Sequence, residues 1–156
     1  MALAVTTIDD SDDLYRRFAA GHIRRDGTLA STAFMLSSRS KGSKIPDPEV
    51  SVDLAKLAPT PDATLQRAGR PDQPEGRPDQ GVAAVTAEFP RSLGLEVRHD
   101  PREGTPDEKE NPAHSLILGN TGELALGRCD RLAEAFDERW LVCPTGATCR
   151  VPRSVR

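Results

Sequence analysis

Residues 125–140, ALGRCDRLAEAFDERW, carry the most regular apolar pattern in the chain. The apolar positions follow one another at steps of four, three, four and four residues, which is the period of one face of an α-helix. This face consists of Ala125, Cys129, Leu132, Phe136 and Trp140. Arg and acidic residues occupy the other faces, so the stretch predicts an amphipathic helix whose apolar side seals the molecule.

Short strands are expected upstream of that helix. Apolar and polar residues alternate there, as in strands with one buried face, in residues 50–54, 81–89, 95–99 and 113–118. Val85, Ala87 and Phe89 would share one face of the second strand, and Pro90 would end it. The fold class predicted is α+β: a small, mostly antiparallel or mixed sheet packed by a C-terminal amphipathic helix.

Local signals predict the character of three further segments. Thr60 before Pro61 predicts a helix start, with the helix ending by Gly69. Residues 14–23, LYRRFAAGHI, predict a short amphipathic helix, and a strand is the alternative because the stretch is brief. Residues 29–36 are apolar, and Ala33, Phe34, Met35 and Leu36 are expected to be buried.

The length of 156 residues fits one domain. We expect a flexible N-terminus over 1–13, one domain over 14–142 with loops at 37–48, 70–80 and 100–112, and a loose tail over 143–156. The tetrapeptide RPDQ occurs twice in the second loop. It is too short to be a stacking repeat and predicts an exposed, disordered insertion.

Composition narrows the possible partners and the compartment. The net charge of −3 and the pI near 5.6 argue against a nucleic-acid partner, because a nucleic-acid binder usually carries a basic excess. The first residues lack the basic and apolar regions of a signal peptide, and no apolar run is long enough to span a membrane. The three cysteines, an odd number, predict a reducing cytoplasm rather than a disulfide framework.

No metal site and no cofactor are expected. Five residues separate Cys143 from Cys149, more than in a zinc knuckle, and Cys129 lies on the apolar helical face. The sequence KGSK at 41–44 lacks the spacing of a phosphate-binding loop.

Two histidines are candidate proton-transfer residues. His99 ends one predicted strand and His114 begins the next, so antiparallel pairing could bring them together at one sheet edge. In the alternative interpretation His99 is exposed beside Asp100, and His114 packs or bonds to the backbone.

A second enzymatic interpretation starts near the N-terminus. An early Arg followed by a Ser/Thr-bearing strand and a late acid is similar to the arrangement by which ADP-ribosyltransferases bind NAD. That resemblance implies roles for Arg16 or Arg17, for Ser31 or Thr32, and for a late acid such as Glu96 or Glu123. His114 would complete the set. The predicted side chains would then converge on one pocket.

The chain as a whole resembles a set of short bacterial proteins. The resemblance covers about residues 14 to 119, and it rests on the following segments: LYRRFAAGHI (14–23), DGTLASTAF (26–34), PEVSVDLAKL (48–57), TPDATL (60–65), GVAAVTAEFPRSLGLEVRHDP (81–101) and NPAHSLILG (111–119). It implies a compact α+β domain and no activity, because none is attached to that set. The doubled RPDQ loop and the cysteine-bearing tail depart from the pattern.

The leading functional expectation is a small non-catalytic accessory or interaction domain. Its partner would be another protein, docked through the Trp140 end of the last helix or along an exposed strand edge. The NAD- or nucleotide-handling enzyme is the alternative. A third hypothesis is weak nucleic-acid contact through Arg39, Lys41, Lys44 and the tail arginines. The sequence does not predict an oligomeric state.

Overall fold

The computed structural model describes residues 3–36 and 45–146; residues 1–2, 37–44 and 147–156 lie outside the described parts. One antiparallel sheet of six strands runs through the molecule in the order β4-β5-β2-β1-β3-β6. The strands are β1 (Asp13–Phe18), β2 (Glu49–Leu54), β3 (Gly81–Thr86), β4 (Glu96–His99), β5 (His114–Leu118) and β6 (Trp140–Val142). The predicted α+β class is therefore confirmed.

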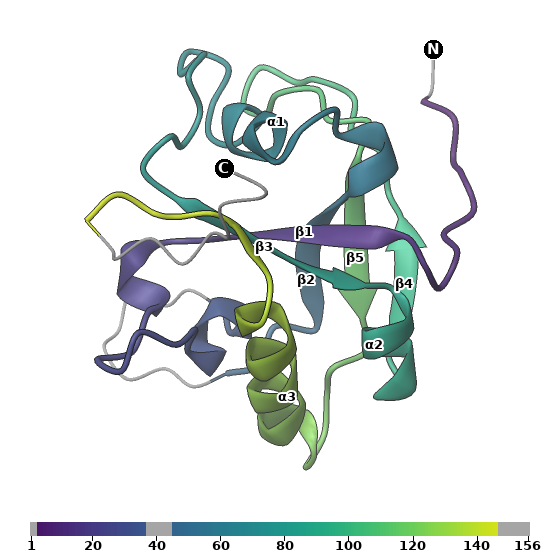
Figure 1. Cartoon of the computed structure of the whole chain (residues 1–156). Helices are drawn as coiled ribbons and strands as arrows, with labels where there is room; N and C mark the ends of the chain where they lie inside the picture. The colour runs from purple at the N-terminus through teal and green to yellow at the C-terminus, as the bar shows by residue number, and fades with distance from the viewer. Residues whose placement is uncertain (1–2, 37–44, 147–156) are drawn as a thin grey trace.

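Helices lie on both faces of this sheet. Figure 1 shows α1 on one side of β1, and α2 and α3 on the other. The α-helices are α1 (Pro61–Gln66), α2 (Glu88–Ser92) and α3 (Ala125–Asp137), and short 3₁₀ helices are η1 (Ala20–His22), η2 (Ser31–Phe34) and η3 (Ala55–Leu57). The α3 helix packs on both η2 and β3, whereas α1 packs on β1 and β3. The face under α3 holds the apolar core.

The core forms because alternate residues of each strand face α3. Leu14 and Phe18 of β1 are buried there, as are Val50, Val52 and Leu54 of β2. Two aromatic pairs connect elements that are distant in the sequence: the ring centroids of Phe34 in η2 and Phe136 in α3 lie 5.2 Å apart, and those of Phe18 in β1 and Trp140 in β6 lie 4.9 Å apart. Such tilted pairs stabilise a core beyond the apolar area they bury.

The predicted C-terminal helix is confirmed, with a correction at its end. Ala125, Cys129, Leu132 and Phe136 are all buried. The helix ends at Asp137, however, and Trp140 belongs to β6, where it pairs with Ala83 of β3. Trp140 is only 3% exposed, so the docking surface expected around it is not available in the folded chain.

The N-terminal segment is a strand, so the helix predicted for residues 14–23 is wrong and the alternative is right. β1 pairs with both β2 and β3. Leu14 and Phe18, four residues apart, share a helix face but equally share a strand face. The sheet provides partners on both sides of this segment, and those backbone hydrogen bonds favour the strand.

Two local boundaries also differ from prediction. β3 ends at Thr86, and Phe89 and Pro90 lie in α2, so Pro90 does not close a strand. A proline is tolerated in the first helical turn, where N–H groups have no intrahelical acceptor. Ala33 and Phe34 are buried as expected, Met35 is half-buried, and Leu36 is 43% exposed against expectation.

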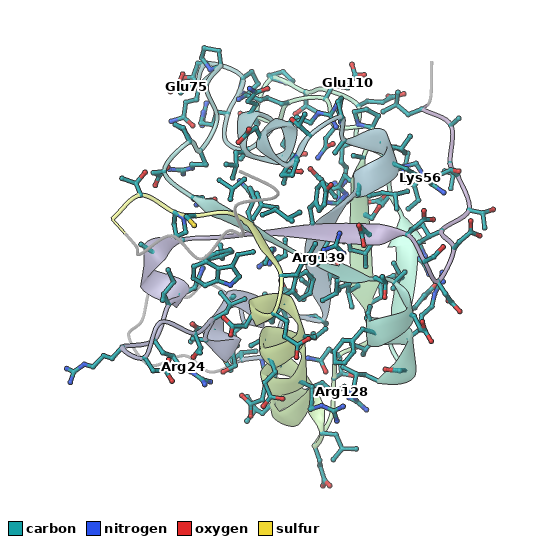
Figure 2. The ribbon with its side chains drawn as sticks, viewed as in Figure 1. Arg24, Lys56, Glu75, Glu110, Arg128 and Arg139 are labelled. Atoms are coloured by element: carbon teal, nitrogen blue, oxygen red, sulfur yellow. The ribbon has the colours of Figure 1, made fainter. Side chains whose placement is uncertain are left out.

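The repeated RPDQ loop has a defined path, which corrects the expectation of disorder. The Arg77 amide donates to the Leu65 carbonyl at 2.9 Å, and Gly76 is buried against α1. Glu75 in this loop and Glu110 in the loop after β4 mark the same end of the molecule, beside α1 (Figure 2). Both loops therefore frame one region of the sheet.

The chain before β1 also packs on the domain. Ile8 is buried, and the Arg91 guanidinium donates to its carbonyl at 2.7 Å. Lys56, which points toward this segment in Figure 2, donates to the Thr7 carbonyl and to Asp12 at 2.8 and 3.0 Å. Among the described residues, no helix has both the length and the apolarity needed to cross a membrane.

Candidate functional site

A cleft of about 270 Å³ opens on the sheet face that carries α1. Its floor consists of β1, β2 and the start of β5, and its walls are α1 and the loop between β4 and β5. The lining residues are Tyr15, Arg17, Ser51, Val52, Asp53, Thr64, Arg67, Ala68, Gly69, Arg102, Glu108, Lys109, Asn111 and His114. Most of these side chains are polar or charged, unlike those of the opposite face.

Strand alternation places the polar floor. Tyr15 and Arg17 of β1 lie on the face opposite to Leu14 and Phe18. Tyr15 pairs with Asp53 of β2, and Asp53 pairs with His114 of β5. Three adjacent strands therefore present polar residues side by side.

The wall formed by α1 is fixed at both ends. The Thr60 hydroxyl accepts a hydrogen bond from the Ala63 amide at 3.3 Å and caps the first turn. At the other end, the Lys109 ammonium donates to the carbonyl of Gln66 at 2.8 Å and of Ala68 at 3.0 Å, and also to that of Gln73. A cation at a helix C-terminus stabilises the carbonyls that lack intrahelical partners.

A hydrogen-bonded chain crosses the middle of the cleft. Asn111 donates from Nδ2 to the carboxylate of Asp53 at 2.9 Å and accepts at Oδ1 from Arg67 at 3.2 Å. Arg67 also reaches the Leu57 carbonyl at 3.4 Å. Asp53 is buried, so its charge requires such partners. These contacts link the strand, the helix and the loop by hydrogen bonds.

Arg17 differs from the other cations of the cleft. Its guanidinium makes no hydrogen bond within the described parts of the chain, whereas Arg67, Arg102 and Lys109 all donate to protein acceptors. Burial lowers the pKa of Arg17, the nearby charge of Asp53 opposes that effect, and Arg77 adds to it. A partly desolvated guanidinium with unused donors is suited to bind an anion.

The charge of the cleft is net positive. Arg17, Arg67, Arg102 and Lys109 are its basic residues, and Asp53 and Glu108 are its acidic residues. Tyr15 lies beside Arg17 on the same strand face, and burial together with the charge of Asp13 raises the pKa of its phenol. Tyr15 therefore stays a neutral hydroxyl donor at physiological pH.

His114 is held between a strand partner and the loop. Its Nδ1 lies 2.9 Å from the Asp100 carbonyl and 3.3 Å from the Asp100 carboxylate. Its Nε2 lies 3.3 Å from the Ser51 hydroxyl. Arg102 bonds to the Asp100 carboxylate at 2.9 Å and completes the cluster.

The predicted NAD-binding residues divide between the two faces of the sheet. Arg17 and His114 line the cleft. Arg16 points to the opposite face, where it donates to the Ala33 carbonyl at 2.6 Å and lies over the Phe34 ring. Burial lowers the pKa of Arg16 to about 10.

The other members of that set lie away from the cleft. Ser31 and Thr32 belong to η2, which packs on α3. Glu96 forms an exposed ion pair with Arg98, and Glu123 is exposed before α3. The structure therefore brings together only two of the predicted residues, Arg17 and His114.

His99 and His114 do not form a pair. β4 and β5 are antiparallel as expected, but His99 lies opposite Ser115, which puts the two histidines on different faces. His99 is buried, not exposed: its Nδ1 accepts from the Thr6 amide at 2.9 Å and its Nε2 lies 2.7 Å from the Pro112 carbonyl. Its role in the structure is to tie the N-terminal segment to the sheet.

Sequence reasoning missed several residues of the cleft. Ser51 and Asp53 stand on the polar positions of the strand predicted at 50–54, so their shared face could have been found from alternation alone. Asn111 and Arg102 come from a loop, and no periodic signal places a loop residue over a particular strand.

No group of three His, Cys, Asp or Glu side chains that could hold a metal ion occurs within the described ranges. Cys129 is buried, and burial raises the pKa of its thiol. Cys149 and the basic residues Arg39, Lys41 and Lys44 lie outside the described residues. The same is true of the arginines at positions 150, 153 and 156.

In comparisons with known proteins, no family model, no curated protein and no solved structure matches this chain.

Proposed function

We propose that this chain is a small binding domain whose cleft accepts the anionic group of a ligand, a carboxylate or a phosphate. The observation that carries the proposal is the Arg17 guanidinium, which lines the cleft without a hydrogen-bond acceptor in the described parts of the chain. This proposal differs from the expectation drawn from the sequence, which was a domain that docks another protein.

The surroundings of Arg17 support an anion rather than a cation. Basic residues outnumber acidic ones around the cleft, and Tyr15 adds a neutral hydroxyl. The acidic residue of the floor, Asp53, already accepts a hydrogen bond from Asn111. A bound anion would therefore accept hydrogen bonds from the unused donors of Arg17. These bonds would offset the free-energy cost of burying part of the Arg17 guanidinium.

Titration calorimetry with inorganic phosphate, succinate and AMP tests this proposal. We expect saturable binding of at least one of these anions, weakened by about tenfold or more in Arg17→Gln, since a hydrogen bond to a charged group contributes about 1.5–3 kcal/mol. Binding should also weaken as the salt concentration rises.

Arg98→Gln is the matched control. Arg98 stands on the same face of the sheet, outside the cleft, and is exposed in an ion pair with Glu96. Both substitutions remove one positive charge, so only Arg17→Gln should weaken binding if the effect is local. Equal losses in the two variants, or no saturable heat with any of the three anions, would contradict the proposal.

The other functions predicted from the sequence have less support. An NAD-handling enzyme keeps Arg17 and His114 in the cleft, but Ser31 and Thr32 lie elsewhere. Adding NAD to the same titrations would test it: binding of NAD well above that of AMP would favour this alternative.

A further inference from the structure

The Ser51 hydroxyl is an exposed group at the floor of the cleft, within reach of a base. Ser51 Oγ lies 3.3 Å from Nε2 of His114, the far end of the hydrogen-bond range but one that catalytic pairs often show before substrate binds. The His114 side chain is 14% exposed, so the imidazole is mostly enclosed while the serine faces the opening.

The surroundings of His114 determine which ring nitrogen carries the proton. Nδ1 lies 2.9 Å from the carbonyl oxygen of Asp100 and 3.3 Å from its carboxylate; the Arg102 Nε–H, which donates to that carboxylate at 2.9 Å, lies farther from Nδ1, at 3.4 Å. Protonated Nδ1 can donate to either oxygen, which leaves Nε2 with a lone pair directed at Ser51. This order of hydroxyl, imidazole and acidic residue is the arrangement that activates serine nucleophiles.

A binding group for substrate lies on the neighbouring strand. Tyr15 of β1 is paired with Asp53 of β2, and the two strands are antiparallel. The next residues on the same face are therefore Arg17 on β1 and Ser51 on β2. Both line the same cleft. An anion bound by Arg17 would thus bring the rest of its molecule over the Ser51 hydroxyl.

We propose that Ser51, activated by His114, attacks the carbonyl carbon of an ester whose anionic end Arg17 binds; this inference rests on the proposed function. Ser51 Oγ bonds to the carbonyl carbon as its proton moves to His114 Nε2. The carbon–oxygen bond to the alcohol then breaks, and the alcohol leaves with that proton. Water attacks the acyl-serine, its proton passes through Nε2, and a carboxylic acid and free Ser51 are released.

The first test measures covalent labelling of Ser51 in the full chain by a fluorophosphonate probe, with the labelled peptide identified by mass spectrometry. We expect one label, on Ser51, that is absent in Ser51→Ala and unchanged in Ser92→Ala, the control for an exposed serine outside the cleft. The labelling rate should fall by about a hundredfold in His114→Gln, the usual contribution of a general base.

The His114→Gln variant could fail to fold, so a second measurement uses the wild-type chain alone: saturating phosphate should slow its labelling.

Turnover provides the second test. Mono-nitrophenyl glutarate, which carries a carboxylate, should be hydrolysed about tenfold faster than neutral nitrophenyl acetate, and Arg17→Gln should abolish that preference.

The two proposals fail in different ways. If phosphate binds but Ser51 is not labelled, or is labelled at a rate independent of His114, the nucleophile is overturned and the binding function stands. If no anion binds to the wild-type chain, both are overturned. Ser92→Ala, which lies outside the cleft, should bind phosphate as the wild type does.

Discussion

His99 and His114 lie on paired strands, and the contacts of their ring nitrogens determine which nitrogen carries the proton in each. His99 accepts the Thr6 amide at Nδ1, so its proton must reside on Nε2, which donates to the Pro112 carbonyl. For His114 the shortest contact of Nδ1 is the Asp100 carbonyl oxygen at 2.9 Å, against 3.4 Å for the Arg102 Nε–H, so the geometry favours a proton on Nδ1, and Nε2 faces the Ser51 hydroxyl. Neutral His99 and neutral His114 should therefore be opposite tautomers.

Long-range proton–nitrogen NMR spectra at neutral pH test this prediction, since the two tautomers give distinct patterns of ring couplings. Ser51→Ala should leave the His114 tautomer unchanged, because Asp100 determines it, and should not affect His99. An Nε2–H tautomer at His114 would remove the acceptor on which activation of Ser51 depends.

Residues 16 and 17 show what the sequence could and could not reveal about the site. Arg16 and Arg17 are chemically identical neighbours, and the helical interpretation of this segment gave no reason to prefer either as the anion-binding residue. Read as a strand, the apolar residues Leu14 and Phe18 assign Arg16 to the core face and Arg17 to the opposite face. The correct partner for an anion was thus available from alternation, once the type of element was known.

At the scale of elements, the docking of the RPDQ loop on α1 makes a measurable prediction. Gly76 has φ of +68°, and a Cβ at this position would lie 2.0 Å from the Leu65 carbonyl oxygen. Gly76→Ala must therefore shift backbone on both sides, and we expect it to lower the free energy of unfolding by about 2 kcal/mol or more.

Gly94→Ala is the control for backbone conformation alone. Gly94 has φ of +81°, and a Cβ there would have no atom within 4 Å. We expect a smaller loss, about 1 kcal/mol, from the left-handed conformation. Denaturant unfolding measures the loss in the free energy of unfolding for both variants, and the difference between the two losses is the steric contribution at Gly76. Equal losses would mean that the loop does not rest on α1.

Short elements were the hardest to predict from sequence for a physical reason. Trp140 continues the apolar spacing of α3, yet its backbone pairs with β3, and only the position of that distant strand decides between the two. Pro90 was predicted to end a strand. A proline is also tolerated in the first turn of a helix, but this interpretation requires knowing where the helix begins. A longer apolar pattern, such as that of α3, is compatible with fewer types of secondary structure.

At the scale of the whole molecule, fold class followed from sequence and strand order did not. Alternation marks β2, β3, β4 and β5, and a helical stripe marks α3. The order β4-β5-β2-β1-β3-β6 places the first strand inside the sheet, between β2 and β3. That order depends on pairings between distant segments, as does the cleft, whose walls come from α1 and the loop after β4.

Trp140 reports on whether those distant segments assemble as one unit. It is the only tryptophan, it is buried, and its ring packs at a tilt against that of Phe18 in β1. We expect its native fluorescence to resist quenching by iodide, and its loss in denaturant to coincide with the loss of far-ultraviolet circular dichroism, as in a two-state domain. Phe136→Ala, which removes the buried ring under Phe34, should shift both transitions together and cost about 3–5 kcal/mol. Ready quenching of the native protein, or a fluorescence transition that precedes the loss of secondary structure, would show that β6 is not part of the folded sheet.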